Sequence, residues 1–145
     1  MVKLRLPFAI FALALTPLAA PLLAGTHPLA ALLIRTFFSR LCHQDPTRSF
    51  LLDGQPIAVC VRCLGIYFGV ALATLRRVEK PIATHLFPIA ILLNLIDVAT
   101  ATLHWHGNLP LPRFLLGLFL GLATGLLLFP VRDLRNARPH LNQTN

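Results

Sequence analysis

The three cysteines of the chain lie in one polar segment, in the pattern Cys-His followed later by Cys-x-x-Cys. Cys42 precedes His43, and two residues separate Cys60 from Cys63. Thiols at this spacing can bind one metal ion or pair with each other. An apolar run without charge, 64–75, follows directly, so the thiols lie where a polar loop enters a hydrophobic helix. We expect the chemistry of the protein at this place.

Zinc binding is the first interpretation. The three thiolates are soft ligands, and one histidine would complete a Cys₃His set, while an open fourth position would suit catalysis. His43 either binds the ion or orients Cys42, because neighbouring side chains usually diverge. His104 and His106 are further candidates, although a His-Trp-His loop around Trp105 also suits the membrane boundary. Copper and iron accept the same ligand types.

Redox chemistry is the second interpretation. Arg62 stands between Cys60 and Cys63, and a cation and a helix N-terminus both favour the thiolate. The placement resembles the bacterial disulfide-forming membrane oxidoreductase, which would imply electron transfer from thiols to quinone. That family carries a second cysteine pair, whereas this chain has only Cys42 in addition. A purely structural disulfide between any two of the three thiols is the third alternative.

The composition is that of a membrane protein. Of the 145 residues, 56% are hydrophobic and 12% are charged, where a soluble domain has about 25% charged residues. The formal net charge is +8, but no basic and aromatic stripe runs along the chain, so nucleic-acid binding is not expected. The expected partner is the lipid bilayer.

We expect an all-α helix bundle in a single membrane domain, residues 1–145. An outer segment, 25–63, contains a short interfacial helix over 28–41 and turns over 47–49 and 53–56. The first apolar segment reads as a retained span, although a cleaved signal peptide has the same pattern. The expected spans are 6–24, 59–75, 84–103 and 113–130.

Four spans place both termini in the cytoplasm of a bacterial cell, with the protein in the inner membrane. Eight of the 13 basic residues then lie inside, as the positive-inside rule favours. The cysteine segment and the loop of His104 and His106 share the outer face.

Two sets of glycines at four-residue spacing mark helix faces for close packing, either within the chain or against other membrane subunits. Gly65 and Gly69 form the first set, and Gly117, Gly121 and Gly125 form the second.

Polar residues inside the expected spans form a second candidate site. Asn94 and Asp97 are one turn apart on one helix face, and Arg113 opens the next span from the same side. A carboxylate in lipid needs a partner, so we expect Asp97 to pair with Arg113, or else with Arg62. The pair is either functional or a clamp between helices.

The motifs CHQDPTRSF and VCVRCLGIYFG resemble a prokaryotic membrane family called domain of unknown function 2085. The resemblance extends from Cys42 to about Gly125 and implies a membrane helix bundle with no assigned activity. The positions that match the family pattern are Cys42, His43, Gln44, Pro46, Arg48, Ser49, Cys60, Arg62, Cys63, Gly65, Tyr67 and Gly69, and more loosely Asp97, Asn108, Arg113 and Gly117.

Overall fold

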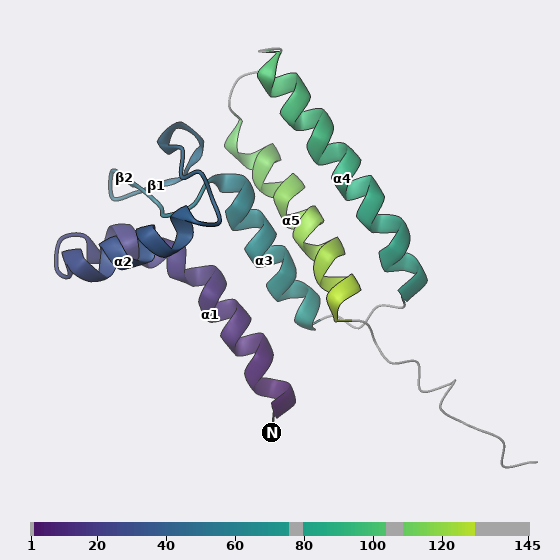
Figure 1. Ribbon diagram of the computed structural model, residues 1–145, viewed down its shortest axis with the longest axis horizontal. Helices are drawn as coiled ribbons and strands as arrows, with labels where there is room; N and C mark the ends of the chain where they lie inside the picture. Colours follow the sequence, from purple (N-terminus) through teal and green to yellow (C-terminus); the bar gives the residue numbers. More distant parts are fainter. Residues whose placement is uncertain (1, 76–79, 104–108, 130–145) are drawn as a thin grey trace, which may run out of the picture.

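The chain is mostly helical, and the computed structural model describes residues 2–75, 80–103 and 109–129 (Figure 1). The helices begin and end within a few residues of the expected segments. In chain order the elements are α1 (Val2–Leu23), α2 (Pro28–Ser39), the 3₁₀ turn η1 (Pro46–Arg48), β1 (Leu51–Leu52), β2 (Gln55–Pro56), α3 (Val61–Leu75), α4 (Lys80–Thr102) and α5 (Pro110–Leu128).

Helices α3 and α5 run parallel and pack against each other through their glycines (Figure 1). A Cβ atom at Gly65 or Gly69 would overlap a backbone carbonyl oxygen of α5. A Cβ atom at Gly117 or Gly121 would overlap a carbonyl oxygen of α3. The two glycine faces expected from the sequence therefore meet each other within one chain. They are buried there, which corrects the idea that they receive other membrane subunits.

Helix α4 lies on the other side of α5 and runs antiparallel to it (Figure 1). From Thr84 onward, where its side chains are described, the buried ones form one stripe, Ala90, Asn94 and Asp97, at the spacing of a single helix face. The large apolar residues around that stripe, such as Leu92 and Leu95, are exposed. A helix that is apolar all round and packed on one side is typical of a membrane span.

Two helices are long and apolar enough to cross a membrane, namely Thr84–Thr102 within α4 and Pro110–Leu128, the whole of α5. Three other apolar stretches, Phe8–Leu23, Pro28–Ser39 and Val61–Leu75, are shorter. About 20 residues are needed to span a bilayer without tilt or thinning. The architecture is thus a membrane-type helical protein with two spans supported by length and composition.

Helix α2 lies across the end of the molecule where α1 ends and where α3 and α5 begin (Figure 1). Its residues Ala31 and Phe38 are buried, whereas Leu29, Leu33 and Phe37 are exposed. These exposed apolar residues face away from the protein, as an interfacial helix would require.

A small antiparallel ladder follows η1, with Leu51 opposite Pro56 and Leu52 opposite Gln55. The expected turn at Asp53 and Gly54 is its connection, and both residues have positive φ values of 52° and 72°. Such values match the two-residue hairpin turn that twists with its strands. The strands themselves were not expected from the sequence.

Candidate metal centre

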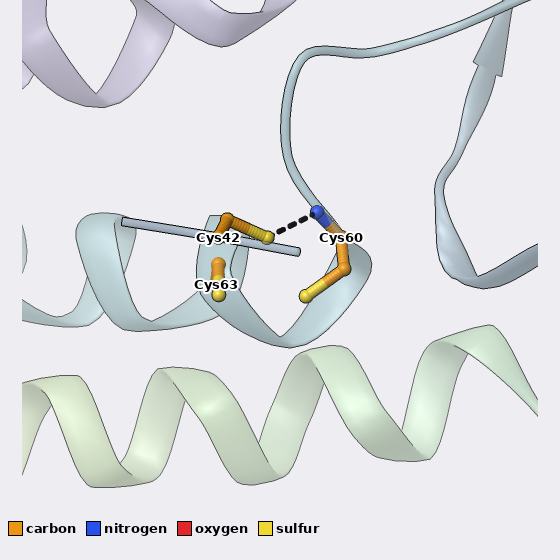
Figure 2. A group of neighbouring side chains, drawn as sticks. All are labelled: Cys42, Cys60 and Cys63. Carbon is orange, nitrogen blue, oxygen red and sulfur yellow. Dashed lines mark hydrogen bonds between the residues drawn. The ribbon is translucent and has the colours of Figure 1, made fainter. Parts of the chain in front are cut away.

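Three sulfur atoms meet at the start of α3. The Sγ atoms of Cys42, Cys60 and Cys63 all lie within 4.8 Å of one another, and the three thiols are free rather than joined in disulfides (Figure 2). Cys42 is buried, and the other two are half-buried. For comparison, tetrahedral zinc–thiolate bonds of about 2.3 Å place sulfurs roughly 3.8 Å apart. Only a small contraction would let the cluster close on one ion.

Helix α2 positions Cys42 in the sulfur cluster. The backbone N–H of Cys42 donates to the carbonyl oxygen of Phe38 at 2.8 Å, which continues the last turn of the helix. The chain then turns sharply at Gln44, whose φ is 52°. The left-handed region is costly for most side chains, so tertiary contacts must hold it.

The Gln44 side chain supplies those contacts. Its Nε2 donates to the carbonyl oxygen of Arg35 at 2.7 Å and to that of Ala58 at 2.8 Å. In the same region, Arg35 Nη2 donates to the carbonyl oxygen of Pro56 at 2.8 Å. These three bonds join α2 to the segment that leads into Cys60. Gln44 and Arg35 therefore fix the distance between Cys42 and the Cys-x-x-Cys pair.

Helix α1 contacts the segment that leads into Cys60. The Ala58 N–H donates to the carbonyl oxygen of Pro17 at 3.2 Å, a group of α1. Phe38, Ile57 and Val59 are almost fully buried beside it. Buried apolar packing of this kind holds side chains in single rotamers, so the sulfurs sit on a rigid base.

The hydrogen bonds in the cluster favour one thiolate. The Cys60 N–H donates to Cys42 Sγ at 3.2 Å (Figure 2). Hydrogen bonds from the Cys60 and Cys63 thiols, with this backbone bond, hold the pKa of Cys42 well below its usual value. The pKa of Cys60 is raised in return, first because its thiol donates to Cys42. Cys42 is therefore the cysteine of the three whose thiolate form is most favoured.

The structure brings together three of the four residues expected as ligands. His43 is exposed and lies outside the sulfur group, in line with the divergence of neighbouring side chains. His104, His106 and Asn108 lie outside the described residues. The described part of the site is therefore a three-thiol cluster that His43 does not join.

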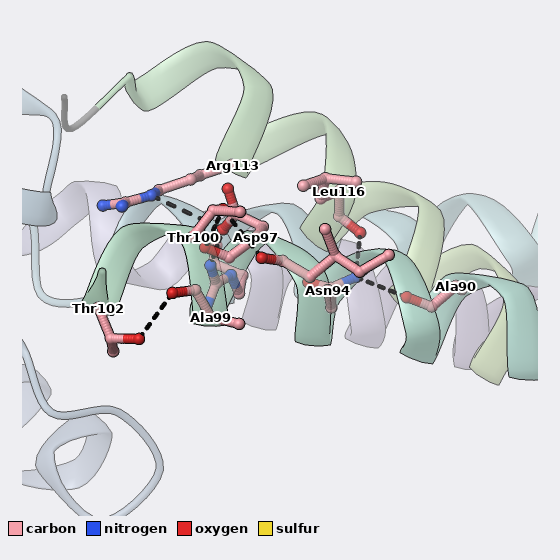
Figure 3. Close-up of polar contacts among 10 residues, drawn as sticks. Ala90, Asn94, Asp97, Ala99, Thr100, Thr102, Arg113 and Leu116 are labelled. Carbon is pink, nitrogen blue, oxygen red and sulfur yellow. Dashed lines mark hydrogen bonds and ion pairs between the residues drawn. The ribbon is translucent and has the colours of Figure 1, made fainter. Parts of the chain in front are cut away.

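Arg62 lies in the first turn of α3, but its guanidinium forms an ion pair with Asp97 of α4. Arg113 Nε lies 3.8 Å from the same carboxylate oxygen, Asp97 Oδ2 (Figure 3). The Asp97 side chain is 9% exposed and that of Arg113 is 7% exposed. The sequence suggested Arg113 as the partner and Arg62 as the substitute. In the structure both arginines share Asp97.

Asn94 joins this polar cluster from one turn away. Its Nδ2 donates to the carbonyl oxygens of Ala90 at 2.9 Å and Leu116 at 3.1 Å, which ties α4 to α5 (Figure 3). The cluster thus connects α3, α4 and α5 close to two of the cysteines, since Arg62 directly precedes Cys63 and follows Cys60 by two residues.

The remaining polar residues of the first motif build the loop after Cys42. Asp45 caps η1, with Oδ1 accepting from the Thr47 N–H at 3.0 Å and from the Thr47 hydroxyl at 2.7 Å. These bonds lower the pKa of Asp45, the hydroxyl contributing most. Arg48 Nε lies 3.4 Å from Asp45 Oδ2, and Ser49 Oγ donates to the Asp45 carbonyl oxygen at 2.8 Å.

Comparison with known proteins agrees with this geometry. Residues 42–127 match the family described as "Predicted membrane protein (DUF2085)". The chain belongs to this family. The matched region begins at Cys42 itself and ends near the end of α5, so it contains the thiol cluster, the Asp97 cluster and the α3–α5 interface. The resemblance seen in the two motifs is confirmed.

Two curated proteins that are similar in sequence to this DUF2085 protein come from archaea. An uncharacterised protein of Methanothermobacter thermautotrophicus is 32% identical over 95 residues, which are 62% of this chain and 86% of that protein. An uncharacterised protein of Methanocaldococcus jannaschii is 58% identical over 33 residues, 23% of this chain and 21% of that protein, so the chain spans only a fifth of this relative. No solved structure matches.

Sequence reasoning missed the roles of Gln44 and Arg35. In the sequence, Gln44 stands out only as a position of the family motif, and Arg35 only falls within the expected interfacial helix over 28–41. For Gln44, the available signal was its position in the sequence, two residues after Cys42 and just beyond the end of a short helix. The bonds to Ala58 and Pro56 could not be foreseen, because those carbonyls are 14 and 21 residues away along the chain.

Proposed function

We propose that this DUF2085 protein is a membrane metal-binding protein whose Cys42, Cys60 and Cys63 thiolates hold one zinc ion. The observation that carries the proposal is the convergence of all three sulfurs within 4.8 Å. A disulfide needs two cysteines, whereas here three sulfurs lie close enough to contact one ion. Three thiolates with one further ligand make an ordinary zinc site.

The surroundings support a metal centre. Cys42 Sγ already accepts the Cys60 N–H, and such bonds to a ligand sulfur stabilise the thiolate form that zinc requires. The fourth position would be filled by water, by a substrate, or by a histidine such as His104 or His106. A zinc site with four protein ligands would cap the helix bundle. A site with three protein ligands and an open fourth position would activate the group bound there.

We infer a four-span topology around this centre, with α1 and α3 crossing together with α4 and α5. The alternating directions of α1, α3, α4 and α5 agree with it (Figure 1). The distribution of basic residues then favours cytoplasmic termini and a metal centre on the outer face of the cytoplasmic membrane.

A thiol oxidoreductase that passes electrons from substrate thiols to quinone is the second candidate. The free Cys60 and Cys63 at the N-terminus of α3 favour it. Two observations weigh against it. The guanidinium of Arg62 is engaged by Asp97, so it does not serve the thiolates, and Cys42 lies within the same sulfur cluster rather than at a second relay site.

The decisive experiment is elemental analysis of detergent-purified protein with counting of free thiols. Wild type should contain about one zinc per chain, with its thiols reactive only after chelation. Cys42→Ser, Cys60→Ser and Cys63→Ser should each lose the ion, because a two-thiolate shell binds far more weakly.

His43→Ala is the matched control, since His43 is exposed next to Cys42 but lies outside the sulfur group. This variant should keep its zinc. Metal-free wild type with Cys60 and Cys63 oxidised to a disulfide would contradict the metal proposal and support the oxidoreductase. Loss of zinc from His43→Ala would make that histidine the fourth ligand.

A further inference from the structure

The backbone of Ala58 is held from two sides just before the Cys-x-x-Cys pair. Its carbonyl oxygen accepts from Gln44 Nε2 at 2.8 Å, and its N–H donates to the carbonyl oxygen of Pro17 at 3.2 Å. Pro17 belongs to α1, whereas Gln44 belongs to the turn after α2. Because Ala58 lies two residues before Cys60, the segment that leads into the thiol pair is tied to α1 and to the Cys42 turn at once.

The Pro17 carbonyl can accept this bond because of the residue four positions later. In an α-helix each carbonyl normally accepts from the N–H four residues further along the chain. For Pro17 that residue is Pro21, which has no N–H to donate. A proline ring also clashes with the carbonyl four residues before it. Both effects favour a Pro17 carbonyl that points out of α1 and takes its donor from another segment.

The surroundings make the contact count. Pro17 and Ala58 are almost fully buried, and Pro21 is buried on the same face of α1 as Pro17. A buried N–H or carbonyl without a partner costs about as much free energy as a lost hydrogen bond. Membrane helices tolerate proline where a neighbouring group satisfies the freed backbone. Here the N–H of Ala58 is that neighbouring group.

We propose that Pro21 is a positioning residue of the metal centre. It acts through the Pro17 carbonyl on Ala58, and through Ala58 on the position of Cys60. The family match begins at Cys42, so α1 lies outside the matched region and yet supplies one of the bonds that hold the ligand segment. This role rests on the proposed zinc site, whereas the bond itself does not.

The test compares Pro21→Ala with wild type as purified full-length proteins in detergent. Alanine supplies an N–H that competes for the Pro17 carbonyl, so hydrogen exchange of the Ala58 amide should become faster. Zinc affinity, measured by competition with a chromophoric chelator, should fall about 3- to 10-fold, the equivalent of one weakened hydrogen bond. The unfolding midpoint of the metal-free protein should stay the same or rise, because a helix interior favours alanine over proline.

Two further variants locate the effect. Pro88→Ala makes the same chemical change inside α4, at an exposed position, and should leave both the exchange of the Ala58 amide and the zinc affinity unchanged. The double variant Pro21→Ala/Gln44→Ala should lose less zinc affinity than the two single effects combined, because both substitutions act on Ala58.

Unchanged exchange of the Ala58 amide in Pro21→Ala would overturn the proposal, whether or not the protein holds zinc. Faster exchange with unchanged zinc affinity would also overturn it, since the bond would then not position a ligand. A lower unfolding midpoint of the metal-free variant, or independent effects in the double variant, would show a merely structural role. Metal-free wild type with faster exchange in Pro21→Ala would remove the proposed function and leave the contact between α1 and Ala58 established.

Discussion

The side-chain amide of Gln44 donates a hydrogen bond of 2.8 Å to the carbonyl oxygen of Ala58, two residues before Cys60. Through this bond the short turn after Cys42 is held against the segment that delivers the other two thiols. The bond crosses from one cysteine-bearing segment to the other, and we expect it to help set the distance between Cys42 and the other two thiols.

Gln44→Ala should therefore lower zinc affinity by about 10- to 100-fold, the usual effect of removing a group that positions metal ligands. The measurement is competition for zinc with a chromophoric chelator in detergent. Gln55→Ala is the matched control, because Gln55 is exposed in the hairpin and should leave affinity unchanged. If the Gln44 variant and wild type have equal zinc affinity, the three thiols reach their positions without the Gln44 hydrogen bonds.

Asp97 and the two arginines should behave as one energetic unit. Asp97→Asn leaves two buried or half-buried guanidiniums without their carboxylate, and breaking such a pair costs about 3–5 kcal/mol. The double variants Asp97→Asn/Arg62→Gln and Asp97→Asn/Arg113→Gln should lose less stability than the sums of their single variants, by about 0.5–3 kcal/mol. Thermal unfolding in detergent gives the comparison.

The coupling with Arg62 should exceed that with Arg113, because Arg62 contacts the carboxylate directly and Arg113 Nε lies 3.8 Å away. Asp53→Asn with Arg40→Gln is the control cycle, since both residues are exposed, and its effects should be additive. Additive losses in both Asp97 cycles would show that the ion pairs do not contribute to stability.

The α3–α5 interface should tolerate no added methyl group. Gly121→Ala places a Cβ atom against the Ile66 carbonyl oxygen, a backbone group that cannot move aside without separating the helices. We expect a loss of about 1–3 kcal/mol, as for other overpacked sites. Gly25→Ala is the control, because a Cβ atom there meets nothing within 4 Å. Unfolding midpoints that are the same for both variants would contradict the tight interface.

Sidedness can be tested with cysteines placed at the two ends of α3. His43→Cys introduces an exposed thiol beside the metal centre, and Leu75→Cys introduces one at the far end of the helix. A membrane-impermeant thiol reagent should label the first variant in intact cells and the second only after the membrane is opened. The unsubstituted chain reports background labelling of the native cysteines. The reverse pattern would place the metal centre in the cytoplasm, where a disulfide would not persist.

The amino-acid sequence by itself determined the helical class, the helix positions and the membrane character of the protein. These follow from composition and from local periodicity, because a run of apolar residues must form a helix in lipid to satisfy its own backbone. It also indicated which residues could bind a metal or pair with a charge, since Cys60 and Cys63 are close along the chain and a carboxylate such as Asp97 in an apolar helix needs a cation. The family resemblance rested on the same local motifs.

Only the tertiary structure decided how these parts meet. Whether Cys42 reaches the other thiols depends on Gln44 and Arg35, whose partners are distant along the chain. Whether the two glycine faces meet each other or another subunit depends on packing between helices rather than on spacing within one. The sharing of Asp97 by Arg62 and Arg113 needed three helices in place at once. Contacts of this kind depend on the relative positions of whole elements, and local sequence patterns do not contain that information.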